Sequence, residues 1–162
     1  MDIKSSFLND ERFTVSKQDV DRIFQQDIAS YNICNIKISK IRKNIKGKII
    51  DLKETDSYKL LNGEITQADY EKYCREQTFG YENHSLESFN NLQRKLINYD
   101  LKKGAIVVDQ FNIIRDGQHR TCILLKEFGP NYKINVVKVK YKGLKIKMII
   151  KIIYSRLLNL FK

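Results

Sequence analysis

The sequence predicts an α+β domain in which helices flank a small mixed sheet, followed by a C-terminal amphipathic helix. Short apolar runs alternate with segments that carry helix-capping residues, as expected for such a domain. The chain has 162 residues, 42% hydrophobic and 30% charged, which suits one globular domain. We expect residues 1–141 to form this domain, including an N-terminal helical extension, and residues 142–162 to form a basic amphipathic helix.

The first third of the domain carries one helix signal and one strand signal. Ser16 followed by Asp19 resembles a capping box, and apolar residues follow at helical spacing, so we expect a helix to about Tyr31. Residues 33–52 are rich in Ile and Lys, and part of this run alternates between the two. The alternation predicts one or two strands with lysines on the solvent-facing side.

The middle of the chain carries three further helix starts. Residues 54–58 open a short helix. Thr66 with Asp69 forms a capping pair that predicts a helix to about Glu76. Ser85 precedes a segment with apolar residues on one side, which predicts a third helix.

The last third alternates between strands and a helix. Residues 105–109, 113–115 and 134–139 are short apolar runs that predict strands. Residues 121–128 have helical spacing, and Gly129 is placed to end that helix. The order of these elements predicts a mixed sheet.

The most informative motif is Asp-Gly-Gln-His-Arg at residues 116–120, between a strand and a helix start. Helix starts carry unpaired N–H groups and a partial positive charge, so they attract anions. His119 and Arg120 add donors suited to phosphate, and Asp116 is suited to a hydrated divalent cation. The motif therefore predicts a phosphate or nucleotide site.

Each residue of the motif also has a purely structural interpretation. Asp116 and Gly117 are a common pair in hairpin turns. His119 is also suited to capping the helix, and Arg120 to a surface ion pair with Glu127 or another acid. The functional interpretation is favoured because three groups suited to phosphate converge at one helix start.

Residues 107–109, 113–120 and 134–139 together resemble the ParB/sulfiredoxin superfamily. In that family a strand enters a glycine-containing turn, and a His-Arg pair follows at a helix N-terminus. The resemblance covers roughly residues 33–140, and the small ATP- or ADP-dependent serine kinases of the family are the most similar in layout. It implies a ParB/sulfiredoxin-like fold, with ATP or ADP and Mg²⁺ as cofactors.

The resemblance also implies residue roles. Glu54 matches the catalytic glutamate and would act as general base, although a lone Glu after a strand is usually solvated. Asp116 would bind Mg²⁺ directly or through water, and His119 would contact a phosphate oxygen during transfer. The implied nucleotide- and phosphate-binding residues are Gly117, Gln118, His119, Arg120 and Thr121. Independently of the resemblance, the place of His84 beside Ser85 at a helix start suits it either to contact the acceptor or to cap the helix.

Two departures from the family narrow the expected activity. Sulfiredoxin needs a reactive cysteine directly before the His-Arg pair, and this chain has Gln118 there. Cys122 lies within the predicted helix and is expected to be a small core residue. In place of the helix-turn-helix domain of DNA-partition ParB proteins, an amphipathic tail follows, so sequence-specific DNA binding is not expected.

The charge distribution predicts where the protein works. The net charge is +11, and residues 142–162 contribute +6 of it without any acid. Residues 144–162 combine a polar stripe with a wide apolar face, which predicts a helix lying on an anionic membrane. The alternative is a core or oligomer helix. Because residues 1–12 do not resemble a signal peptide, we expect a cytoplasmic protein at the inner face of the plasma membrane.

These observations predict an Mg²⁺-dependent nucleotide phosphotransferase. Its acceptor would be a hydroxyl of a small molecule, a sugar or a lipid-linked glycan, because residues 54–58 also resemble a segment of ParB-like proteins associated with bacterial surface-polysaccharide synthesis. The alternative is a non-catalytic nucleotide- or nucleic-acid-binding module. That alternative rests on a run of basic residues that are interleaved with isoleucines: Lys37, Lys40, Arg42, Lys43, Lys46 and Lys48.

Overall fold

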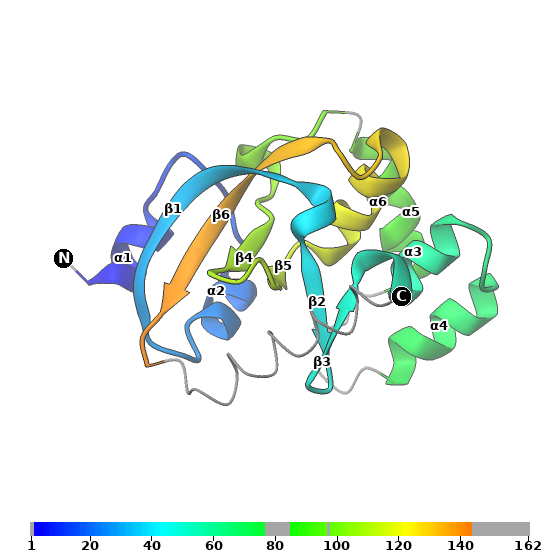
Figure 1. The fold of residues 1–162 in the computed structure, drawn as a ribbon, viewed down its shortest axis with the longest axis horizontal. Helices are drawn as coiled ribbons and strands as arrows, with labels where there is room; N and C mark the ends of the chain where they lie inside the picture. Colours follow the sequence, from blue (N-terminus) through cyan, green and yellow to red (C-terminus); the bar gives the residue numbers. More distant parts are fainter. Residues whose placement is uncertain (1, 77–84, 97, 144–162) are drawn as a thin grey trace.

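A four-stranded mixed sheet forms the centre of the protein in the computed structural model, which describes residues 2–76, 85–96 and 98–143 (Figure 1). The strand order is β1 (Ile28–Lys37), β6 (Lys133–Tyr141), β4 (Val107–Asp109) and β5 (Ile114–Asp116). β6 is antiparallel to β1 and parallel to β4, and β5 returns antiparallel to β4. The predicted α+β class and mixed sheet are confirmed.

Helices cover both faces of this sheet. Val107 of β4 belongs to a core cluster with Phe7 of α1 (Ile3–Leu8) and Val20 of α2 (Lys17–Ile23). The next residue, Val108, belongs to the opposite cluster with Tyr58 of α3 (Asp56–Leu61) and Leu124 of α6 (Gln118–Phe128). Consecutive strand residues point to opposite faces, so the sheet is the buried middle layer.

A third cluster joins α6 to two more helices at the end of the molecule away from α1 (Figure 1). Tyr70 of α4 (Gln67–Glu76) and Phe89 of α5 (Leu86–Lys95) pack with Ile123 of α6, and all three side chains are nearly inaccessible to solvent. α6 therefore lies between the sheet and a helical layer made by α3, α4 and α5.

A separate hairpin lies between the two ends of the molecule (Figure 1). It consists of β2 (Arg42–Ile45) and β3 (Lys48–Asp51), and its turn residues Lys46 and Gly47 both have positive φ. A parallel bridge between Arg42 and Ile113 ties the hairpin to the start of β5. The remaining short elements are the 3-10 helices η1 (Ile38–Lys40), η2 (Leu52–Glu54) and η3 (Leu101–Lys103).

The N-terminal helix is shorter than the sequence predicts. α2 ends at Ile23 with Phe24 as its C-cap, and the segment expected to continue it to Tyr31 instead begins β1. Tyr31 pairs with Val139 of β6, more than a hundred residues away. The prediction was wrong because long-range strand pairing outweighs the local helical spacing.

Local capping signals were reliable elsewhere. The side chains of Ser16, Thr66 and Ser85 accept hydrogen bonds from backbone N–H groups three residues later, as predicted. Gly129 is the C-cap of α6, with φ of 79°. The strand predicted at 134–139 lies within β6.

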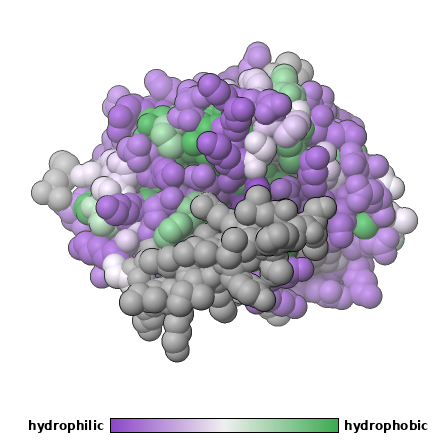
Figure 2. Space-filling view, viewed as in Figure 1, coloured by the Kyte–Doolittle hydropathy of each residue, from purple (hydrophilic) through white to green (hydrophobic). Residues whose placement is uncertain are grey.

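The described surface is mostly hydrophilic on the face drawn in Figure 2, where apolar residues form separate patches. Among the described residues, no helix is both long enough and apolar enough to cross a membrane. The predicted membrane helix at 144–162 and the predicted acceptor residue His84 lie outside the described residues.

Candidate functional site: the start of α6

The Asp-Gly-Gln-His-Arg motif forms the junction between β5 and α6, as predicted. Asp116 ends β5, Gly117 is the N-cap residue, and Gln118 begins the helix. Gly117 adopts the left-handed conformation, with φ of 84°. Because glycine has no side chain, the N-cap residue supplies no acceptor for the N–H groups of the first helical turn.

Gly117 also lies unusually close to the strand below it. A Cβ atom at this position would lie 2.9 Å from Cγ1 of Ile106 and 3.0 Å from its Cα, closer than side chains normally pack. The close approach seats the start of α6 directly on the chain entering β4. Only glycine satisfies both the backbone conformation and this distance.

Replacing Gly117 with alanine is expected to destabilise the protein more than replacing Gly63, which also has a positive φ, of 72°. Both variants place a side chain at a positive φ, which costs about 1–2 kcal/mol. At Gly63 no atom of the described chain lies within 4 Å of the added Cβ. The contact with Ile106 should therefore cost Gly117→Ala about 1–3 kcal/mol more. Urea unfolding measures the difference, and equal losses for the two variants would contradict the packing argument.

Asp116 is a half-buried carboxylate between two arginines. Its oxygens lie 3.5 Å from Nη2 of Arg22 and 3.7 Å from Nη1 of Arg120. Burial raises the pKa of Asp116, and the nearby charge of Asp19 raises it further, whereas Arg120 and Arg22 oppose the change. A raised pKa in the folded state favours the protonated form. The stability that Asp116 contributes is therefore present at low pH and is lost as the pH rises through the raised pKa. Groups whose pKa is shifted by burial and by nearby charges, as that of Asp116 is, cluster at functional sites.

Arg120 connects the helix to the segment that enters the sheet. Its Nη1 donates to the carbonyl oxygen of Ala105 at 3.0 Å. Its guanidinium also covers Gly104, where a Cβ would lie 2.9 Å from Cζ of Arg120. Of the acids considered as partners of Arg120, its ion pair is with Asp116 and not with Glu127. Part of the guanidinium of Arg120 is therefore engaged in contacts within the protein, with Ala105, Gly104 and Asp116.

The side chains of Gln118 and His119 face the helical layer. Nε2 of Gln118 donates to Oγ of Ser57 at 3.2 Å. Nε2 of His119 lies 3.0 Å from the hydroxyl of Tyr70, and its ring meets Phe89 edge-on. These two predicted phosphate ligands are thus engaged within the protein, and the backbone N–H groups of the first turn are the better candidates for binding an anion.

The next residue of the helix is likewise used internally. Oγ1 of Thr121 donates to the carbonyl oxygen of Gly117 at 2.8 Å, and Thr121 is fully buried. This bond closes the first turn of α6 around the glycine. Thr121 supports the site through its position and has little exposed surface for a ligand.

The predicted catalytic segment lies beside α6, but Glu54 has a local role. Oε1 of Glu54 accepts a hydrogen bond from the N–H of Asp51 at 3.1 Å, within a capping box, and the residue is exposed. The following Thr55 has Oγ1 3.3 Å from Sγ of Cys122. The contacts of Thr55 and Ser57 bring this segment against the first two turns of α6.

Cys122 is the buried core residue that the sequence predicts. It has no exposed surface, and burial raises its pKa to about 12. A thiol with so high a pKa is not a nucleophile at neutral pH. The structure therefore gives no support to sulfiredoxin-like chemistry at this cysteine.

Arg22 is a residue of this site that sequence reasoning missed. It extends from α2 to the end of β5, where Nη2 donates to the carbonyl oxygen of Arg115 at 2.6 Å. It also pairs with Asp19 at 2.9 Å. No local pattern could have identified it, because its partners at β5 lie about ninety residues further along the chain.

Lys43 is the second missed residue, and here the prediction of a solvent-facing lysine was wrong. Lys43 is half-buried, whereas Lys37, Lys40, Lys46 and Lys48 are exposed as predicted. Burial lowers the pKa of Lys43, and the positive charge of Arg22 lowers it further. The pairing of the two strands accounts for this burial, because Lys43 lies directly opposite the buried Ile50 of β3 and shares its face of the hairpin.

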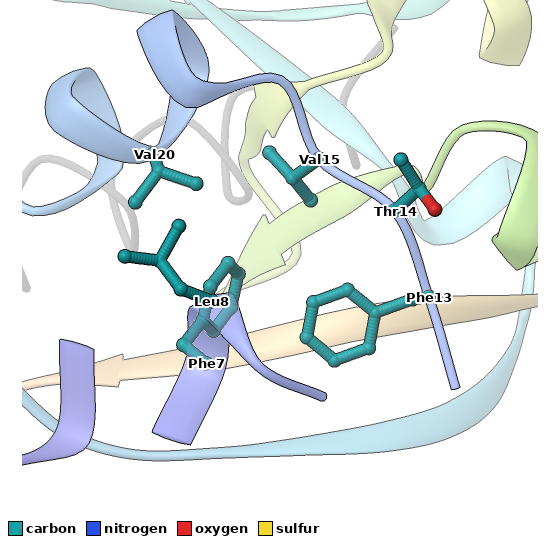
Figure 3. Close-up of a pocket in the computed structure, with 6 residues that line it drawn as sticks. All are labelled: Phe7, Leu8, Phe13, Thr14, Val15 and Val20. Atoms are coloured by element: carbon teal, nitrogen blue, oxygen red, sulfur yellow. The ribbon is translucent and has the colours of Figure 1, made fainter. Parts of the chain in front are cut away.

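A pocket of about 120 Å³ lies elsewhere, against α1 and α2 (Figure 3). Its lining residues are Phe7, Leu8, Phe13, Thr14, Val15 and Val20. None of them can titrate or carry a charge, and none belongs to the Asp116–Arg120 motif. This pocket therefore offers a phosphate ligand no charged side chain.

The predicted Mg²⁺ role of Asp116 fits this arrangement poorly. The carboxylate oxygens already face Arg22 and Arg120. Within the described part of the chain, no three His, Cys, Asp or Glu side chains are grouped so that they could hold a metal ion. An Mg²⁺ ion in this site would therefore depend mainly on phosphate oxygens and water.

Comparisons with protein-family models, with curated proteins and with solved structures give no match to this chain. The resemblance to the ParB/sulfiredoxin superfamily stays a prediction from the motif and its flanking strands. The function must accordingly be argued from the geometry at the start of α6.

Proposed function

We propose that the start of α6 binds the phosphate groups of a nucleotide and that the protein transfers a phosphoryl group to a hydroxyl. The supporting observation is that a helix start whose N-cap residue is a glycine lies beside arginines from two elements. Arg22 comes from α2 and Arg120 from α6, and both lie within 4 Å of Asp116. Backbone N–H groups together with guanidinium groups are the donors that suit phosphate oxygens.

In this proposal the chain positions the phosphate and removes a proton. The acceptor oxygen attacks the terminal phosphorus, the bond from that phosphorus to the nucleotide breaks, and the hydroxyl proton passes to Glu54. Glu54 would first have to release the N–H of Asp51, its hydrogen-bond partner in the capping box. Mg²⁺ would supply charge neutralisation on the phosphates, and no step assigned to these residues depends on it.

The proposed acceptor is a small molecule, a sugar or a lipid-linked glycan. This part of the proposal rests on the resemblance of residues 54–58 and not on the geometry at the start of α6. The placement of the acceptor at the cytoplasmic membrane face rests on the +6 charge of residues 142–162. The proposal for the acceptor is thus separable from the proposal for nucleotide binding.

One observation favours a non-catalytic nucleotide-binding module as the second candidate. Glu54 is exposed and already hydrogen-bonded, whereas a general base is normally poised by its surroundings. A protein of this kind would bind nucleotide at α6 without turnover. The four exposed lysines of β1, η1 and the β2–β3 hairpin give it a surface suited to nucleic acid, for which binding would weaken steeply with salt.

Nucleotide binding and turnover distinguish the two candidates. We expect calorimetry to detect ATP or ADP binding in the presence of Mg²⁺, and ³¹P NMR to detect transfer to a sugar hydroxyl or to water. Glu54→Gln should lower the transfer rate by about 100-fold or more while affinity stays within about twofold. The matched control is Glu127→Gln, an exposed residue at the far end of α6.

Three outcomes carry different consequences. Failure of ATP and ADP to bind would overturn the proposed function. Binding without any transfer would favour the binding module. Turnover that survives Glu54→Gln would remove Glu54 from the reaction while leaving the α6 site in place.

A further inference from the structure

Lys43 faces the same site from the hairpin. Its cross-strand partner is Ile50, which is 7% exposed, so the two side chains share the inner face of the hairpin. The preceding residue, Arg42, forms the parallel bridge with Ile113. The hairpin therefore places Lys43 alongside β5, the strand that ends in Asp116.

The charges around Lys43 do not balance. Four cationic side chains approach this region: Arg22 from α2, Lys43 from β2, Arg115 from β5 and Arg120 from α6. Each arginine has a carboxylate within 4 Å, and the three carboxylates are those of Asp19, Asp109 and Asp116. The ammonium of Lys43 makes no hydrogen bond and no ion pair within 4 Å with any described residue, although the charge of Asp116 acts to raise its pKa.

An unpaired ammonium in a half-buried position is costly, and the cost falls when an anion binds beside it. Arg22 lies close enough to Lys43 to lower its pKa, so the two cations repel each other in the absence of ligand. A small dianion placed between them would replace that repulsion with two attractions. Lysine serves as a point-charge ligand for phosphate, and arginine adds directional N–H donors.

We propose that Lys43 and Arg22 together bind one phosphate group beside the start of α6. The inference rests on the proposed function only in taking phosphate as the ligand chemistry. That chemistry is shared by free inorganic phosphate and by the terminal phosphate of a nucleotide. The site consists of an ammonium from β2, a guanidinium from α2 and the N–H groups of the first turn of α6.

Lys43→Met tests the proposal, because methionine keeps much of the apolar stem and removes the charge. The control is Lys48→Met, an exposed lysine on the other strand of the same hairpin. Calorimetry with inorganic phosphate, pyrophosphate and ATP should show an affinity loss of about 10- to 100-fold for Lys43→Met and less than about twofold for Lys48→Met. Lys43→Arg should retain most of the affinity.

A second measurement reports on Lys43 directly. NMR titration of the lysine side chains in the intact protein should show the pKa of Lys43 rising when inorganic phosphate is added, with no change at Lys48. A folded Lys43→Met variant that binds inorganic phosphate as tightly as the wild type would overturn the proposal. So would a pKa of Lys43 that does not respond to phosphate.

The outcomes separate this inference from the proposed function. If phosphate binding depends on Lys43 and neither ATP nor ADP binds, the phosphate site stands and the nucleotide phosphotransferase fails. If ATP binds equally well to the wild type and to Lys43→Met, the nucleotide site stands and the role of Lys43 fails.

Discussion

Replacing Asp109 with alanine is expected to lower the free energy of unfolding by about 3–5 kcal/mol, the usual cost of breaking a buried ion pair. Asp109 is fully buried at the end of β4. Its Oδ1 accepts hydrogen bonds from the N–H groups of Phe111 and Ile113, at 2.8 and 3.0 Å. Its Oδ2 accepts one from Nη2 of Arg115 at 2.8 Å.

The loss would extend beyond the missing hydrogen bonds. The guanidinium of Arg115 lies over the ring of Tyr141 and has little contact with water, so removing Asp109 leaves a half-buried positive charge without its carboxylate. The turn between β4 and β5 would also lose the side chain that holds it, at a point where Asn112 has φ of 64°. β5 carries Asp116, so the candidate site depends on this turn.

Urea unfolding measures this effect, and Asp21→Ala is its matched control. The carboxylate of Asp21 lies 2.8 Å from Nζ of Lys4, but both side chains are exposed. An exposed pair is screened by solvent and contributes little, so the control should lose far less stability than Asp109→Ala. If the two variants lost similar free energies of unfolding, the buried ion pair of Asp109 would contribute no more to stability than the exposed ion pair of Asp21.

Local signals explain what the sequence could predict. Ser16, Thr66 and Ser85 announce helix starts because each satisfies backbone N–H groups within its own first turn. The end of α2 and the start of β1 were misassigned because the competing interaction comes from β6. No window of local sequence contains both strands.

The same distinction applies to the candidate site. The strand, turn and helix of the 116–120 motif are local, and the structure places them as predicted. The orientation of each side chain depends on residues far away in the sequence: Ser57 for Gln118, Tyr70 for His119 and Ala105 for Arg120. Sequence reasoning therefore found the backbone of the candidate site, whereas the contacts of its side chains depend on residues outside any local window.

Tyr70→Ala is expected to cost about 3–5 kcal/mol, as for other large aromatic residues removed from a core. Tyr70 has no exposed surface, and its ring packs against Tyr73 and Phe89, with centroids 5.9 and 5.4 Å away. Burial raises the pKa of Tyr70 well above its usual range, so the hydroxyl stays protonated at neutral pH. Tyr70→Phe keeps the ring and removes only the hydroxyl, with its contacts to His119, Ser57 and Cys74, and should cost about 0.5–1.5 kcal/mol.

The comparison of the two variants tests whether the helical layer positions the start of α6. Urea unfolding gives the global stability, and hydrogen exchange of the N–H of Thr121, which donates to the carbonyl oxygen of Gly117, gives the local stability of the first turn. If the hydroxyl of Tyr70 orients His119, Tyr70→Phe should speed exchange in this turn more than in the rest of α6. Uniform exchange along α6 would instead mean that the hydroxyl of Tyr70 does not position the first turn, and that the layer supports α6 mainly through packing at Ile123.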